Sequence, residues 1–209
     1  MVDLWFPIVT GRTLPSDHGY AMYGAISRIL PKLHEMDGWA LHTLRGKPLG
    51  PGVISLSSSP RLGLRLPAEA IGAVLPLAGR KLEIRGHHIS LGSPTVVTLL
   101  AHSALSARIV TIKSFMDAGP FGEAVTRHLA EIDPRCAEGT VVVGARKVVT
   151  IDHKKVVGFS VRISGLSEEA SLLVQAKGIG GRRRMGCGVF RKSERDLALD
   201  ERPMREAAE

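Results

Sequence analysis

Gly178-Ile179-Gly180-Gly181-Arg182-Arg183-Arg184-Met185-Gly186-Cys187-Gly188 places two Gly-x-Gly segments around three consecutive arginines. Glycine tolerates a positive φ and lets a backbone approach a ligand closely, because it has no Cβ. Arginine presents a flat fork of donors that suits phosphate. The stretch predicts a loop that binds a polyanion, although a glycine turn with solvated charges is the alternative. The expected contact residues are Lys177, Gly178, Gly180, Gly181, Arg182, Arg183, Arg184, Gly186 and Gly188.

Two familiar phosphate motifs do not match this stretch. It lacks the Gly-Lys-Ser/Thr ending of a P-loop, and Arg183 stands where a dinucleotide fingerprint needs its third glycine. Both motifs also follow a strand and open a helix. Here the preceding segment, Ser167 to Lys177, has the pattern of a helix with Ser167 as N-cap and Gly178 as terminator. A short apolar strand is expected after the loop, around Val189-Phe190.

Composition indicates a globular protein with an anionic partner. The 209 residues are 44% hydrophobic and carry a formal net charge of +8, which favours nucleic acid first and an anionic membrane surface second. No apolar run approaches the roughly 18 residues of a membrane-spanning helix, and no signal-peptide pattern opens the chain. The two cysteines, Cys136 and Cys187, have neither metal-binding nor disulfide-framework spacing and are typical of a reducing cytoplasm.

The first half of the chain alternates strands and helices. Ser16 or Asp17 is expected to cap a helix with Met22 and Ile26 on its apolar face, and Pro31 must end or kink that helix. The remaining expected elements are strands at 1–10 and 39–44, a Gly/Pro break at 46–52, paired strands at 53–56 and 61–66, a short helix at 67–75 and a strand at 80–85. A second basic surface is expected from the strand residues Arg61, Arg65, Arg80, Lys81 and Arg85, although simple solvation of exposed strand charges is the alternative.

The second half repeats this order. It contains a strand at 108–113, a helix from Pro120, a hairpin of strands 140–151 and 156–163 around residues 152–155, and the helix from Ser167. The sequence therefore predicts an α+β fold of two tandem ferredoxin-like (βαββαβ) units with a C-terminal glycine-rich loop. The expected boundaries are residues 1–104 for the first unit, 105–192 for the second and 193–209 for a disordered tail.

With these motifs the sequence resembles the CRISPR repeat-processing endoribonucleases of the repeat-associated mysterious protein (RAMP) superfamily, in the variant of myxobacterial-type class 1 systems. The glycine-rich loop is the specific part of the resemblance. Two weaker parts are the helix entry, Asp17-His18-Gly19-Tyr20-Ala21-Met22-Tyr23, and Leu33-His34-Glu35 beyond the helix.

The resemblance implies metal-independent cleavage of precursor CRISPR RNA within its repeats, by attack of a 2′-hydroxyl on the adjacent phosphate. It also implies retention of the guide RNA in many cases, with no cofactor. His34 falls at the position of the catalytic histidine of archaeal relatives, His18 falls near that of others, and Tyr20 joins them as a candidate. Ser27 and Ala40 stand where the archaeal pattern has a tyrosine and a lysine. The residues available to replace these two are Tyr20, Tyr23, Lys32 and Arg45.

Four further alternatives concern the chemistry of the site and the functional class of the protein. The set His34, Glu35, Asp37 and His42 matches no structural zinc spacing, so no metal site is expected. Only 4% of the residues are aromatic, so recognition through RNA backbone and 2′-hydroxyls is favoured over base stacking on a sheet. A non-catalytic RAMP subunit that binds guide RNA is the main alternative, and an unrelated ferredoxin-like metabolic protein is a weaker one. The expected partners are CRISPR repeat RNA and other subunits of a class 1 effector complex, in the cytoplasm and away from membranes.

Overall fold

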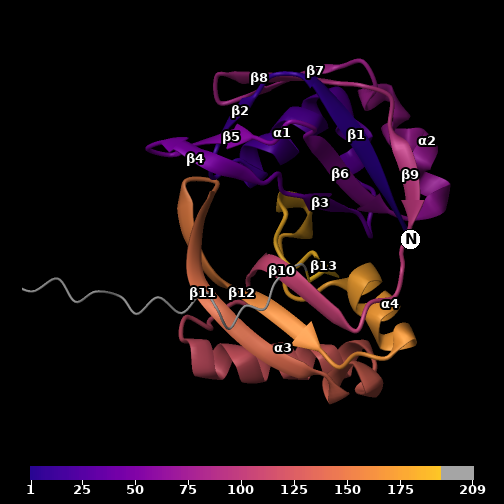
Figure 1. Cartoon of the computed structure of the whole chain (residues 1–209), viewed down its shortest axis with the longest axis vertical. Helices are drawn as coiled ribbons and strands as arrows, with labels where there is room; N and C mark the ends of the chain where they lie inside the picture. Colours follow the sequence, from indigo (N-terminus) through magenta and orange to yellow (C-terminus); the bar gives the residue numbers. More distant parts are fainter. Residues whose placement is uncertain (194–209) are drawn as a thin grey trace, which may run out of the picture.

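A computed structural model describes residues 1–193 and arranges them in two stacked halves (Figure 1). Buried apolar residues from positions 2–91 form one hydrophobic cluster, and those from positions 105–190 form another. The boundary predicted between residues 104 and 105 remains a prediction. The predicted tail lies outside the described residues, apart from Ser193, whose N–H donates to the carbonyl of Ala104 at 3.0 Å.

The N-terminal half is built on the long first strand, in which Leu4, Phe6 and Ile8 are buried as their alternation predicts. Its six-stranded antiparallel sheet has the order β3-β6-β1-β8-β7, and β9 also pairs with β1. These strands are β1 (Val2–Thr10), β3 (Ala40–His42), β6 (Arg61–Leu66), β7 (Lys81–Ile84), β8 (His87–Leu91) and β9 (Thr95–Thr98).

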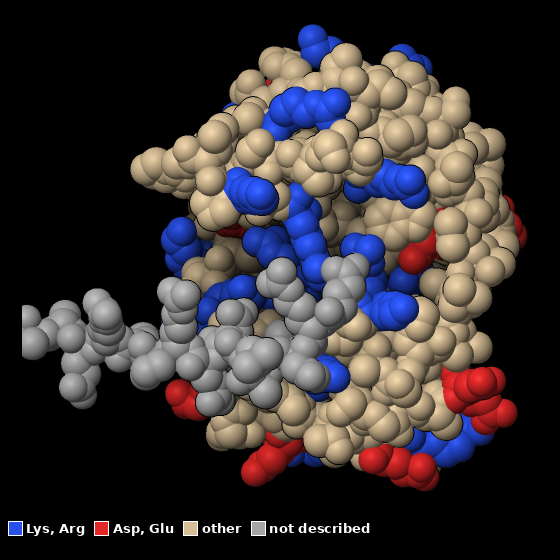
Figure 2. Space-filling view, in the orientation of Figure 1, with Lys and Arg blue, Asp and Glu red and all other residues tan. Residues whose placement is uncertain are grey.

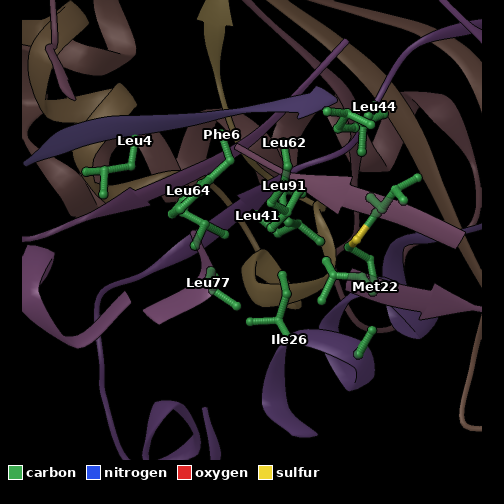
Figure 3. Close-up of a cluster of buried hydrophobic side chains, with 14 of the residues drawn as sticks. Leu4, Phe6, Met22, Ile26, Leu41, Leu44, Leu62, Leu64, Leu77 and Leu91 are labelled. Carbon is green, nitrogen blue, oxygen red and sulfur yellow. The ribbon is translucent and has the colours of Figure 1, made fainter. Parts of the chain in front are cut away.

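Helix α1 (Gly19–Ile29) packs its apolar face, including Met22 and Ile26, against this sheet (Figure 3). The helix ends before Pro31, and a separate 3₁₀ turn, η1 (Pro31–His34), follows it. This confirms the predicted break, since proline cannot supply the N–H that a continuing helix needs. The predicted N-cap was wrong, because His18 takes that position without a side-chain capping bond. Asp17 instead accepts a hydrogen bond from the Thr150 N–H at 2.7 Å.

The C-terminal half has the ferredoxin-like order β-α-β-β-α-β, with its fourth strand beside its first in the sheet β11-β12-β10-β13. Apolar residues of both helices cover one face of this sheet. Ser167 caps the second helix as predicted, since its hydroxyl accepts from the Ala170 N–H at 3.2 Å. The elements are β10 (Ala104–Val110), α3 (Ala118–Ile132), η4 (Pro134–Glu138), β11 (Thr140–Ile151), β12 (Lys154–Ser164), α4 (Glu168–Lys177), η5 (Arg183–Met185) and β13 (Arg191–Lys192).

The α+β fold of two ferredoxin-like units is confirmed, but one predicted strand pairing in the first half was wrong. The strands expected at 53–56 and 61–66 do not pair with each other. The first is β5 (Val53–Leu56), which joins β2 (Thr13–Pro15) and β4 (Gly46–Gly50) in a separate three-stranded sheet, so the expected Gly/Pro break contains a strand. The strand expected at 80–85 is β7, and it pairs with β8. Long-range pairing of this kind depends on partners that no local pattern identifies.

The short helix predicted at 67–75 is divided into three pieces: η2 (Ala68–Ala70), α2 (Ile71–Val74) and η3 (Leu75–Leu77). The strand predicted near Val189-Phe190 begins two residues later, at β13. Arg65 does not belong to an exposed basic surface, because its side chain is 1% exposed.

Candidate functional site

The glycine-rich loop, residues 178–188, lies between the two halves of the molecule (Figure 1). Its two ends are held together, because the Ile179 N–H donates to the Gly188 carbonyl at 3.2 Å. The Gly188 N–H donates to Ile109 at 2.8 Å, and the Gly181 N–H donates to Thr111 at 3.1 Å, so the loop is fixed to the end of β10. A Cβ on Gly19 at the start of α1 would lie 2.2 Å from the Met185 carbonyl, so the loop also packs against the first half.

Most glycines of the loop are required by positive φ values and by contacts inside the protein, and their contact with RNA remains a prediction. Gly178, Gly180, Gly186 and Gly188 have positive φ values between 67° and 84°. A Cβ on Gly180 would lie 2.3 Å from the Thr111 carbonyl. At Gly181, by contrast, a Cβ would meet nothing within 4 Å. Gly181 is thus the glycine of this set at which the backbone faces open space.

The three consecutive arginines have different environments. Arg182 is exposed and in the left-handed conformation, with φ 65°. Arg183 is half-buried and donates from Nη2 to the Ala176 carbonyl at 2.8 Å. Burial, with a smaller effect of nearby Arg65, lowers the pKa of Arg183 to about 10. Of the three, only Arg182 presents an exposed guanidinium, so the prediction that all three bind phosphate has its best structural support at this residue.

Arg184 connects the loop to the turn that follows α1. Its guanidinium donates to the carbonyls of His34 at 3.0 Å and Met36 at 2.7 Å, and to Oδ1 of Asp37 at 3.0 Å. It also lies over the Trp39 ring, 5.9 Å from the centroid. A planar, multidentate guanidinium thereby fixes the position of η1 relative to the loop.

His34 lies on η1 with its side chain exposed and beside a tyrosine. The Tyr23 hydroxyl lies 2.6 Å from Nδ1 of His34, and the two rings meet edge to face with centroids 5.4 Å apart. Tyr23 in turn stacks against Trp39. When Nδ1–H donates to Tyr23, Nε2 is an acceptor, and in the imidazolium form both nitrogens donate. The pair can therefore accept or supply a proton at a solvent-facing position.

His18 has a different environment. It is buried, Nδ1 lies 2.8 Å from the Pro15 carbonyl, and Nε2 accepts from the Leu44 N–H at 3.1 Å. Because a carbonyl only accepts, Nδ1 carries the proton and both nitrogens are satisfied by backbone. Desolvation lowers the pKa of His18. This geometry favours a role in joining the start of α1 to the strand region after His42.

Tyr20, the third predicted catalytic residue, is half-buried on α1 and lines a small cavity with Asp17, Thr43 and Arg108. Within residues 1–193 no hydrogen bond or ring contact joins Tyr20 to His34. Of the four residues that the sequence left open as replacements, Tyr23 is the one in contact with His34. The catalytic role of His34, His18 or Tyr20 itself remains a prediction.

A buried ionic network, which the sequence did not reveal, supports both ends of the loop. Arg65 forms a bidentate pair with Asp3, at 2.7 and 2.8 Å. Its Nη1 also donates to the carbonyls of Gln175, before the loop, and Phe190, after it. Arg65 and His42 hold the pKa of Asp3 well below its usual range despite its burial. The network thus joins β1 and β6 to both segments that flank the loop.

Basic side chains gather in the hollow between the two halves (Figure 2). Arg45, Arg108 and Arg191 line a small pocket together with Gly186 and Val189, and we call the arginine-lined surface at this pocket the central cleft. Phosphate contacts from arginine position a nucleic acid without reading its sequence. The central cleft therefore suits an RNA backbone.

The described part of the chain has neither a metal-binding cluster nor a membrane-spanning helix. No group of three or more His, Cys, Asp or Glu side chains in residues 1–193 is arranged to hold a metal ion. None of the helices in that range has the length and apolar character needed to cross a membrane.

The chain is similar to Cas6 proteins over most of its length. The family model described as "Cas6 Crispr" matches residues 2–194. The CRISPR-associated endonuclease Cas6 of Myxococcus xanthus (strain DK1622) is 43% identical over 189 residues, which are 90% of this chain and 80% of that protein.

Solved structures with low sequence identity share the fold. A CRISPR-associated protein Cas6 superimposes with a TM-score of 0.68 at 13% identity, covering 92% of this chain and 98% of the other. The product of a Cas6-related gene from Pyrococcus furiosus gives 0.67 at 15% identity, covering 94% and 99%. A RAMP protein described as binding different RNA substrates gives 0.67 at 16% identity, covering 92% and 99%.

Proposed function

The chain belongs to the Cas6 family of CRISPR-associated proteins, and on that premise we propose that it cleaves precursor CRISPR RNA within its repeats, without a metal ion. The observation that carries the proposal is the contact between Tyr23 and His34, on an exposed turn that Arg184 ties to the glycine-rich loop. Among the described residues, these contacts bring a proton-transfer pair beside the arginine-containing loop.

The reaction follows from these groups. The 2′-hydroxyl attacks the adjacent phosphorus, a bond forms from O2′ to phosphorus, and the bond from phosphorus to O5′ breaks. His34 takes the proton of the 2′-hydroxyl and then gives it to the departing O5′, with Tyr23 holding the ring in place. The products are a 2′,3′-cyclic phosphate and a free 5′-hydroxyl. We assign the stabilisation of the phosphorane charge to Lys32, which is exposed on the same turn as His34.

We also propose that the mature guide RNA stays bound. Cleavage breaks one phosphodiester bond and leaves the other phosphate contacts of a bound repeat in place. Arg182 and the central cleft would therefore continue to hold the product. Co-elution of protein and product in size-exclusion chromatography after complete cleavage tests this, and release of free product would contradict it. Assembly with other subunits of a class 1 effector complex remains a prediction.

Incubation of the purified protein with a repeat RNA in EDTA tests the function directly. We expect cleavage in EDTA, and we expect a 2′-deoxy substitution at the cut to abolish cleavage while leaving binding nearly intact. The same substitution one nucleotide away is the matched control. Cleavage that requires a divalent ion would contradict metal independence. Binding without cleavage would instead support the alternative of a non-catalytic guide-RNA-binding subunit.

A further inference from the structure

A second concave site lies in the C-terminal half, on the side of the loop that carries Arg182. This groove of about 720 Å³ is formed by the segment after β10, the side of α3 and the first part of the loop. We call it the side groove. Lys113, Phe115, His128, Lys177, Gly181 and Arg182 are among its lining residues.

Three basic side chains from three different segments surround the side groove. Lys113 follows β10, Lys177 ends α4 and Arg182 belongs to the loop, and all three are exposed. Within residues 1–193 none of the three has a carboxylate partner. Glu131, the acidic residue of the lining, is paired with His128 at 3.2 Å. The side groove therefore has uncompensated positive charge.

The lining also has an apolar part. Ile112, Phe115 and Ile132 are partly buried and pack against the core of the C-terminal half. The guanidinium of Arg127 lies 5.6 Å from the centroid of the Phe115 ring. Apolar and aromatic surface beside a cationic rim is the composition that holds unpaired nucleotides, whose bases need apolar contact and whose phosphates need charge. A volume within the range of small-ligand sites, about 300–1,000 Å³, suits a short single strand rather than a duplex.

The loop joins the side groove to the candidate active site. Arg182 lines the groove, whereas Arg184, two positions later, contacts the main chain of His34. A single-stranded RNA segment that runs from His34 along the loop would thus reach the side groove. Resting on the proposed function, we propose that the side groove binds a single-stranded segment of RNA that flanks the cleaved structure.

Binding of a repeat hairpin RNA with or without a short oligouridine extension, on its 5′ or its 3′ side, tests the proposal. The 2′-deoxy substitution at the cut keeps the RNA intact. We expect an extension on one side to raise the affinity of the wild-type protein and to steepen its salt dependence. The Lys113→Ala/Lys177→Ala variant should lose the affinity that the extension adds. Its log–log slope of RNA affinity against salt should be lower by about 1.4, taking about 0.7 per phosphate contact with a single strand. Its affinity for the unextended hairpin should fall by much less than its affinity for the extended RNA, because Lys177 also borders the glycine-rich loop.

Arg80→Ala/Lys81→Ala is the matched control, because it removes two exposed positive charges from the N-terminal half. If both double variants lose affinity equally for every RNA, the effect is one of net charge and the side groove is not the site. If extensions add nothing while uridine monophosphate binds through Lys113 and Lys177, the groove holds nucleotides and the proposal is wrong. A wild-type protein that cleaves the repeat but gains nothing from either extension overturns this inference alone. Failure to bind or cleave any repeat RNA overturns the proposed function as well.

Discussion

Arg184 donates a hydrogen bond to the main-chain oxygen of His34 at 3.0 Å, although 150 positions separate the two residues. The contact brings a loop of the second half to the turn that carries the candidate catalytic histidine. Because the Arg184 guanidinium is engaged by oxygens of the turn, we assign it a positioning role.

Arg184→Lys should lower the single-turnover cleavage rate by up to about 100-fold, with little change in the Kd for RNA. Lysine keeps the charge but lacks the planar fork that holds several oxygens at once, and a displacement of about 1 Å can cost that much. Arg182→Lys is the control and should leave both quantities near wild type. A large rise in Kd with an unchanged rate would instead assign Arg184 to RNA binding.

Arg182 and its neighbour should differ in salt dependence. Arg182→Gln should lower the log–log slope of RNA affinity against salt by about 0.7 to 0.9, the loss of one phosphate contact. Arg183→Gln removes the same charge, but the Arg183 side chain donates to Ala176 inside the protein. It should therefore reduce the free energy of unfolding and change the slope less. Equal slopes for the two variants would contradict the different roles given to these arginines.

Substitution of the loop glycines should lower the stability of the folded protein, apart from any effect on RNA binding. Gly180→Ala and Gly186→Ala each place a Cβ on a residue with positive φ, against Thr111 and Thr43 respectively. Each should lower the free energy of unfolding by about 1–3 kcal/mol. Gly181→Ala, where the space is open, should cost much less. Chemical denaturation of the three variants measures this, and equal stabilities would show that the loop is not packed as described.

Stability should fall as the pH falls from about 6.5 to about 4. Burial lowers the pKa of His42 to about 4, against opposing effects of Asp3, whereas a histidine in the unfolded chain titrates near 6.5. Between these values the unfolded state binds a proton that folded His42 does not. The free energy of unfolding should therefore decline by up to about 1.4 kcal/mol per pH unit for each such histidine. His18, whose pKa is also lowered, adds in the same direction.

The variant His42→Gln should make this decline shallower, and His88→Gln, at an exposed position, should not. Asp3 adds a further loss only below about pH 4, where its unfolded form takes up a proton that the folded form refuses. Denaturation midpoints of the wild-type protein and both variants, measured across this pH range, test the prediction. A flat profile from pH 6.5 to 4 would contradict neutral, buried histidines in the folded protein.

Sequence patterns predicted the elements whose structure depends mainly on residues close in the sequence. Alternation marked β1, proline marked the break after α1, and Ser167 marked the start of α4. The same patterns placed His34 on a separate turn beyond the helix. The α+β fold of two ferredoxin-like units followed from the order of these elements.

Features set by distant partners could not be predicted in this way. Arg65 alternates like an exposed strand residue, and its burial depends on Asp3, 62 positions away, and Gln175, 110 positions away. Likewise, glycines that fit a ligand-binding loop equally fit a loop packed on its own protein. Tyr23 was one of four candidates in the sequence, and its contact with His34 across the Pro31 break distinguished it.

The single-turnover cleavage rate of His34→Ala on a repeat hairpin RNA tests most directly whether His34 performs proton transfer in RNA cleavage. We expect the rate to fall by about 100-fold or more, the scale of a removed general acid or base, while the Kd for the RNA stays near wild type. Tyr23→Phe should give a smaller loss in the same assay. A His34→Ala protein that cleaves at the wild-type rate would contradict the account.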